Sequence, residues 1–250
     1  MIAALSATIR ARWRTLGESR RDLVLVVVLA ALAFLPALGN RDLWNPDEAR
    51  YAEVAREMVQ RGDLAHFFVP HLNGEVYTQK PPLLFWSMAA FGALVGGVGE
   101  TTARLPLALS AIAATALTFA IGRRLFGRRA AWIAALSFAT AGQILWQGRF
   151  GQIDMLLIAL VTLAMALFVR GWTEARPRFY LAFFAATGFA TLAKGPVGLL
   201  PPLFAILVFL VWSRHREEIT HLGIGRGLLL CLAVVLLWLG PAAWFGGWAY

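Results

Sequence analysis

The chain has 250 residues, of which 59% are hydrophobic and 15% are charged, and its formal net charge is +9. A soluble domain carries about 25% charged residues, so this composition excludes an ordinary soluble protein and indicates an integral membrane protein. The positive charge does not indicate a nucleic-acid partner, because the arginines flank apolar segments, which is the pattern that orients membrane helices.

Eight apolar runs approach the length of about 20 residues that a helix needs to cross a bilayer. They cover residues 22–39, 83–99, 103–121, 131–147, 153–170, 179–193, 196–212 and 227–246. The first run follows paired arginines, as a secretory signal does, but its apolar core is longer than most signal cores and several more runs follow. We therefore expect a retained first helix.

The arginines decide whether the second run, 83–99, crosses the membrane. If it does not cross, "GRRLFGRR" and most other arginines lie in cytoplasmic segments, as the positive-inside rule requires. Two prolines at the start of this run, glycines at its end and the early Trp86 are typical of an interfacial helix. We predict an all-α integral membrane protein with about seven transmembrane helices. Its first outer loop, residues 40–102, carries amphipathic juxtamembrane helices.

The stretch "NPDEARYAEVAREM" in this loop predicts an amphipathic helix on the membrane surface. We expect Asn45 to cap it, Pro46 to take the first helical position, Glu48 to close a capping box and Gly62 to end it. Asp47 and Glu48 then have two interpretations. They favour the helix start, or they form a reaction site at headgroup height with a cation from the same loop.

That cation is in "GEVYTQKPPLLFW", where Tyr77 to Lys80 should run extended into a helix that starts at Pro81. A lysine beside a helix N-terminus can bind a lipid phosphate, or it can be a snorkelling anchor.

Two further motifs lie on the same predicted side of the membrane. "GRFGQIDML" holds Arg149 and Asp154 as part of a site or as a salt-bridged loop, and "LAKGP" breaks the apolar pattern at Lys194 as a cavity lining or an ordinary turn. His66 and His71 lack metal-like spacing and are interpreted as loop residues.

Together, "NPDEARYAEVAREM", "LNGEVYTQKPPLLFW", "ARLPLALSA", "GRRLFGRRAAW", "GQIDML" and "LAKGP" resemble, in this order, the bacterial glycosyltransferases of the membrane-embedded C-type fold. This group includes the lipid A aminoarabinose transferases and, more distantly, the protein O-mannosyltransferases. The resemblance implies a polyprenyl-phosphate sugar donor and a catalytic acidic motif, matched by Asp47 and Glu48, with Asp154 as a second acidic residue.

In such an enzyme, the phosphate leaves as a stable anion, so a base and a cationic site suffice. The residues expected to bind the donor phosphate are Lys80, Tyr77, Arg149 and Lys194. Gln79 stands where the aminoarabinose transferases have an acid, so the sugar stays open, and a divalent metal is possible but not implied.

The expected function is glycosyl transfer to a lipid A-like or protein acceptor at the outer, periplasmic face of the bacterial inner membrane. The alternatives are a polytopic transporter or lipid flippase and a membrane scaffold. A transporter would bury ionisable residues within its spans, whereas these charges lie at span ends. Members of the group are longer, so we expect residues 1–250 to be the N-terminal part of such an enzyme, without its C-terminal spans and outer domain.

Overall fold

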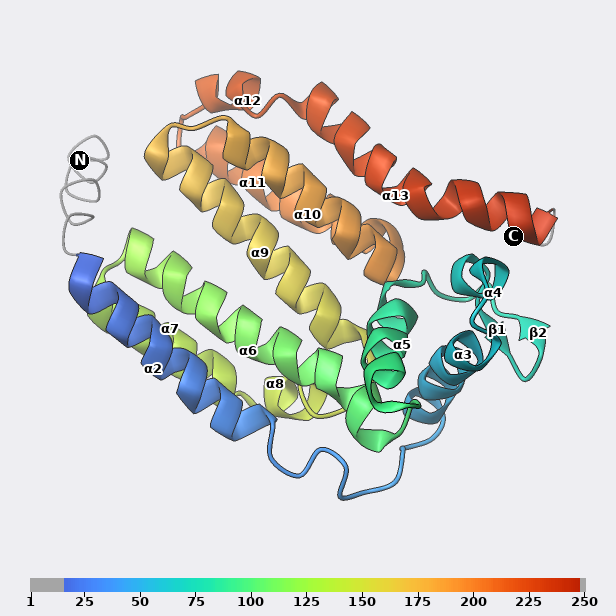
Figure 1. Cartoon of the computed structure of the whole chain (residues 1–250). Coiled ribbons are helices and arrows are strands. Elements are labelled where there is room, and N and C mark those ends of the chain that lie inside the picture. The colour runs from blue at the N-terminus through green and yellow to red at the C-terminus, as the bar shows by residue number, and fades with distance from the viewer. Residues whose placement is uncertain (1–15, 248–250) are drawn as a thin grey trace.

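The computed structural model describes residues 16–247, and this part of the chain is a bundle of helices with one short hairpin (Figure 1). The elements are α2 (Leu16–Phe34), α3 (Asp47–Arg61), α4 (Leu64–Phe68), β1 (His71–Leu72), β2 (Glu75–Val76), α5 (Leu83–Val95), α6 (Glu100–Leu125), α7 (Arg128–Thr140), α8 (Gly142–Gln147), α9 (Ile153–Glu174), α10 (Arg178–Lys194), the 3-10 turn η1 (Gly195–Gly198), α11 (Leu200–Trp212), α12 (Glu217–His221) and α13 (Ile224–Gly246).

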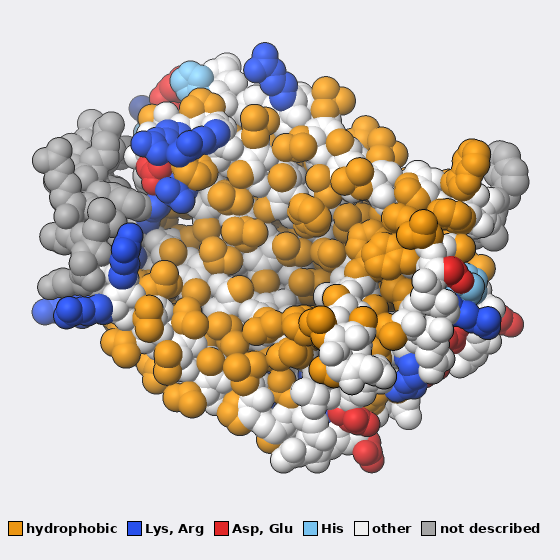
Figure 2. Space-filling view, viewed as in Figure 1, with side chains coloured by type: hydrophobic (Ala, Val, Ile, Leu, Met, Phe, Trp, Pro, Cys, Tyr) orange, Lys and Arg blue, Asp and Glu red, His pale blue; other side chains and the backbone are white. Residues whose placement is uncertain are grey.

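The long helices lie side by side, with α6 packed against α2, α7 and α9, and α10 packed against α9 and α13. The short elements α3, α4, α5, α8 and the hairpin gather at one end, while α12 and the α6–α7 and α9–α10 turns lie at the other (Figure 1). Hydrophobic side chains cover the middle of the visible face, and charged side chains gather towards its ends (Figure 2). This distribution suits an integral membrane protein, whose middle contacts lipid.

Within residues 16–247, three helices, α6, α9 and α13, are long and apolar enough to cross a membrane, and α10 with α11 gives at most a fourth because this pair is bent by 84°. One of the predicted apolar runs is not a single helix, whereas the bend between α10 and α11 falls where the predicted runs 179–193 and 196–212 adjoin. The run 131–147 is divided at Ala141, which has extended backbone between α7 and α8. The bend after α10 falls at Gly195, whose φ of 78° favours glycine, followed by Pro196.

α5 has 13 residues and ends at Gly96, whose φ is 89°. At 1.5 Å per residue it is about 20 Å long, shorter than the ~30 Å hydrocarbon core of a bilayer. The predicted interfacial helix over 83–99 agrees with this length. The helix begins at Leu83 and not at Pro81, two residues later than the prediction.

The hairpin of β1 and β2 was not predicted from the sequence. Its turn residues, Asn73 and Gly74, have φ values of 56° and 81°, as a two-residue turn with two left-handed positions requires. The Glu57 carboxylate on α3 accepts hydrogen bonds from both of their backbone N–H groups. This contact attaches the hairpin to α3, just before the segment that carries Lys80.

α3 forms close to the predicted place and ends at Gly62, which is left-handed with φ 66°. The predicted cap is wrong. Pro46 occupies the N-cap position without a side-chain cap, and Glu48 accepts from the backbone N–H of Trp44. Proline has no N–H to complete a capping box, which explains why this carboxylate reaches further back. The apolar face of α3 packs against α5 inside the protein.

Candidate functional site

Arg104 on α6 is completely buried and uses all five of its N–H donors. Nε and Nη2 donate to the two carboxylate oxygens of Glu48 at 2.7 and 2.8 Å. The other three bonds, of 2.6 to 2.8 Å, go to the backbone carbonyls of Leu38, Arg41 and Asp42. A buried cation is stable when it is paired and fully hydrogen-bonded, so this contact joins α6 to residues 38–48.

Glu48, which is 1% exposed, also accepts from the backbone N–H groups of Trp44 and Gly151, each at 2.7 Å. Burial would raise the pKa of this carboxyl group, but the hydrogen bonds from Arg104, Trp44 and Gly151 outweigh it and hold the pKa below its ordinary value. A Cβ at Gly151 would come within 2.9 Å of Glu48 Cγ, so glycine permits this approach. We call Glu48, Arg104 and Gly151 the buried node.

Asp47 lies on the same helical turn in a different environment. Its side chain is 42% exposed, and its carboxylate is 3.7 Å from the Arg50 guanidinium. The node therefore fixes the turn from one side, while the neighbouring carboxylate stays accessible.

Two buried tyrosines accompany Asp47. Burial raises the pKa of Tyr51 to about 12, and the negative charges of Asp47 and Asp154 add to this effect. Burial also raises the pKa of Tyr77. The nearby Arg50 lowers this pKa in part, and the negative charge of Asp47 raises it. Both tyrosines are thus neutral hydrogen-bond donors at physiological pH. The carboxylates of Asp47 and Asp154 both lie close enough to raise the pKa of Tyr51.

Asp154 lies in the first turn of α9 and forms an ion pair with Lys194 at the end of α10. Their side chains are 34% and 33% exposed, so the pair is open to solvent or ligand. This contact brings together two predicted site residues that are 40 positions apart in sequence. A partly exposed pair of this kind can be opened by an incoming anion at modest cost.

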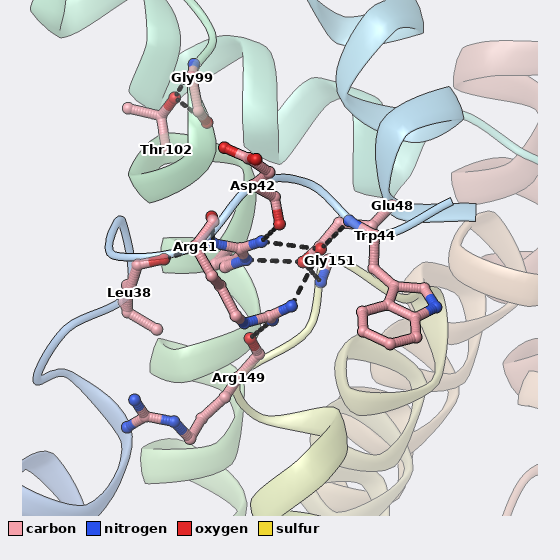
Figure 3. Close-up of polar contacts among 10 residues, drawn as sticks. Leu38, Arg41, Asp42, Trp44, Glu48, Gly99, Thr102, Arg149 and Gly151 are labelled. Carbon is pink, nitrogen blue, oxygen red and sulfur yellow. Dashed lines mark hydrogen bonds and ion pairs between the residues drawn. The ribbon is translucent and has the colours of Figure 1, made fainter. Parts of the chain in front are cut away.

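Lys80 and Arg149 have different surroundings. In the part of the chain that the structure describes, the partly buried Lys80 has no ion-pair or hydrogen-bond partner, so its amine is available. Arg149 instead donates to the carbonyls of Ala33 and Pro36 at 3.0 and 2.7 Å, which ties it to the end of α2. Its guanidinium points away from Glu48 (Figure 3).

No group of three or more His, Cys, Asp or Glu side chains that could hold a metal occurs within residues 16–247. His66 packs on His71 with ring centroids 4.4 Å apart, and its Nδ1 lies 2.8 Å from the Asp63 carboxylate. Both imidazoles therefore make these contacts with residues of the first loop.

The sequence did not identify Arg104, Gly151 or Tyr51 as site residues. An arginine at the start of an apolar helix was the available signal for Arg104, since such a charge needs a partner when the helix packs. Its partner is 56 positions away, which no local pattern shows.

The fold and site define a class: an integral membrane protein that collects acids, lysine and tyrosines at one end of its helices. The sequence model described as dolichyl-phosphate-mannose-protein mannosyltransferase matches residues 79–239, which is more than half of the chain. The chain belongs to this family.

Among curated relatives, an undecaprenyl phosphate-alpha-4-amino-4-deoxy-L-arabinose arabinosyl transferase of Shewanella sediminis is 32% identical over 228 residues. The match covers 89% of this chain and 41% of the relative. A protein of the same name from Pseudomonas aeruginosa (strain UCBPP-PA14) is 30% identical over 87% of this chain and 39% of its own. The chain thus spans about two fifths of the length of these relatives.

Two solved structures of ArnT from Cupriavidus metallidurans are similar to this chain, each with a TM-score of 0.80. The apo structure is 30% identical and covers 91% of this chain and 42% of its own. The structure bound to undecaprenyl phosphate is 31% identical and covers 88% and 41%.

Proposed function

We propose that the full-length protein transfers a glycosyl group from a polyprenyl-phosphate-linked sugar to a lipid A-like or protein acceptor. The observation that carries this proposal is the accessible Asp47 on a turn held by the buried node. The likeness to a solved ArnT bound to undecaprenyl phosphate supports a polyprenyl-phosphate donor.

The proposed reaction needs one base and one anion site. The acceptor hydroxyl oxygen forms a bond to the anomeric carbon, the bond from that carbon to the donor phosphate oxygen breaks, and the polyprenyl phosphate leaves as an anion. Asp47 accepts the hydroxyl proton. Lys80 neutralises the developing phosphate charge, and Tyr77 and Tyr51, which both contact Phe85, are hydrogen-bond donors.

We assign the remaining predicted residues by their contacts. Asp154 and Lys194 act as a pair, in which Lys194 is available to the donor phosphate and Asp154 orients it. Glu48 is proposed to position the turn that carries Asp47, because its oxygens are already occupied. Arg149 is proposed to anchor α2 and is left out of the phosphate site.

We also propose seven membrane crossings with α5 at the outer interface, which places Asp47 and Lys80 on the periplasmic side of the inner membrane. Labelling of single cysteines tests this topology. Phe126 in the α6–α7 turn is 71% exposed, and Gly142 at the start of α8 has open space around it. Phe126→Cys should react only from the cytoplasm and Gly142→Cys only from outside. The reverse pattern would overturn the proposed orientation.

Mass spectrometry of envelope lipids and glycoproteins from cells with and without the full-length protein tests the function. We expect one saccharide-bearing product to disappear in its absence and to return with the wild-type protein. Identical profiles, in cells shown to express the wild-type protein and in cells that lack it, would exclude transfer.

A further inference from the structure

Three aromatic rings form a cluster beside the buried node. Trp146 and Phe150 stack with their centroids 3.7 Å apart, and Trp44 meets Phe150 and Trp146 edge-on at 6.3 and 6.4 Å. The Arg41 guanidinium lies over the Phe150 ring, 3.8 Å from its centroid. We call Trp44, Trp146 and Phe150 the aromatic platform.

The platform is open on the side of its two indoles. Phe150 is 8% exposed and forms the base, whereas Trp44 is 62% and Trp146 is 48% exposed. Two large adjoining rings held on a buried third ring offer a rigid apolar surface. Arg41 braces this base, because its Nη2 donates to the Arg149 carbonyl at 2.8 Å and its buried Nη1 lies 3.5 Å from the Glu48 carboxylate. The open surface, with an indole N–H on each tryptophan, suits a ligand with both apolar faces and hydroxyl groups.

The backbone links this platform directly to the proposed reaction site. The Trp44 N–H donates to Glu48, and Gly151, which follows Phe150, donates to the same carboxylate. Asp47 precedes Glu48 on the turn that these bonds hold. The platform is therefore fixed relative to the proposed base.

The Lys80 segment reaches α3 by way of other elements. Tyr51 and Tyr77 both contact Phe85 of α5, at centroid distances of 5.8 Å. The platform instead combines Trp44, from the loop before α3, with residues of α8 and of the loop before α9. The platform and the Lys80 segment therefore reach the Asp47 turn through different contacts.

We propose that the aromatic platform binds the sugar ring of a saccharide-headed lipid acceptor. This inference rests on the proposed function and names the acceptor class and its subsite. The C–H bonds on one face of a pyranose are electron-poor, and they pack favourably on the electron-rich face of an indole. The platform thus holds the acceptor while Asp47 takes its hydroxyl proton.

Tryptophans at a membrane surface also serve as lipid-facing anchors, which gives the opposing interpretation. Trp212 and Trp244 are 86% and 85% exposed and have no ring contact within the described residues. They provide matched controls, because replacement of an anchoring tryptophan should have the same effect at any of these positions. The Trp44→Ala variant keeps its backbone N–H, so the hydrogen bond to Glu48 remains possible.

The test is the affinity of the purified full-length protein for three probes: lipid A in mixed micelles, undecaprenyl phosphate and a serine-rich peptide. We expect Trp44→Ala and Trp146→Ala to weaken lipid A binding by about tenfold each. Trp44→Phe should retain part of the lost affinity, because it keeps an aromatic face. Undecaprenyl phosphate binding should not change, and Trp212→Ala and Trp244→Ala should bind lipid A as the wild type does.

Wild-type affinity for lipid A in both platform variants would overturn the proposal. An equal loss in the Trp212 and Trp244 variants would also overturn it, in favour of membrane anchoring. Binding of the peptide but not of lipid A would exclude a saccharide-headed acceptor. Lipid A binding that depends on the platform, in a protein that transfers no sugar, would support the subsite while the proposed function fails.

Discussion

Asp47 and Glu48 are adjacent acids on one helical turn, and their surroundings separate them into two kinds of carboxylate. Glu48 is enclosed and bonded to Arg104, Trp44 and Gly151. Asp47 is 42% exposed beside one arginine at 3.7 Å. A carboxylate that is fully hydrogen-bonded has no free lone pair for a substrate proton, whereas an accessible one does. In the proposed function, Glu48 therefore supports the turn and Asp47 carries out the chemistry.

The largest expected effect is on turnover in Asp47→Asn. The amide keeps the size of the side chain but accepts no proton, so turnover should fall by about 10² to 10⁴-fold. Affinity for undecaprenyl phosphate should be retained, because Lys80 is unchanged. Steady-state transfer and donor binding by the purified full-length protein measure both. Asp42→Asn is the control, since Asp42 is exposed and only its carbonyl contacts Arg104; equal losses in both variants would contradict the role of Asp47.

Arg104→Ala should remove the centre of the buried node. It leaves the Glu48 charge buried without its main partner, which costs about 3 to 5 kcal/mol. Thermal unfolding in detergent measures the change. Arg104→Lys keeps the charge but loses the two-pronged contact, so it should give a smaller loss. Wild-type stability in Arg104→Ala would show that the node does not hold the fold.

Lys80→Ala should weaken donor binding by removing a charge-assisted contact worth roughly 1.5 to 3 kcal/mol, or about ten- to more than a hundredfold in affinity. Titration with undecaprenyl phosphate measures this change. Arg61→Ala, at the exposed end of α3, removes a cation of the same loop and should have little effect. Unchanged affinity in a folded Lys80→Ala protein would return this lysine to the role of a membrane anchor.

The smallest expected effect is in Gly151→Ala. The added methyl group would lie 2.9 Å from Glu48 Cγ, so the turn must shift, at a cost of about 1 to 3 kcal/mol. The matched control is the free energy of unfolding of Gly142→Ala, because a Cβ added there would meet no neighbouring group within 4 Å. Equal stability of the two variants would mean that Gly151 tolerates a side chain.

Local patterns predicted the elements whose causes are local. Gly62 ends α3, α5 is a short apolar helix, and the chain breaks after Lys194, each as residue chemistry indicates. Apolar periodicity did not predict the division at Ala141, because residues on both sides of it are apolar or small.

The sequence indicated which residues belong to the candidate site but not which residues they contact. The acids and lysines were recognised from the motifs, but their partners come from distant segments. Glu48 contacts Arg104 and Gly151. Arg149 donates to the carbonyls of Ala33 and Pro36 at the end of α2, which are 116 and 113 positions away in sequence. Because packing and not spacing decides such partners, the sequence could not separate the role of Glu48 from that of Asp47.

A paired measurement on Asp47→Asn and Glu48→Gln tests the division between these two acids most directly. Thermal unfolding and turnover per folded molecule are compared in the full-length protein. The predicted result is a clear loss of stability in Glu48→Gln, and near-normal stability with lost turnover in Asp47→Asn. Near-normal turnover in Asp47→Asn, together with an inactive Glu48→Gln of wild-type stability, would contradict the account.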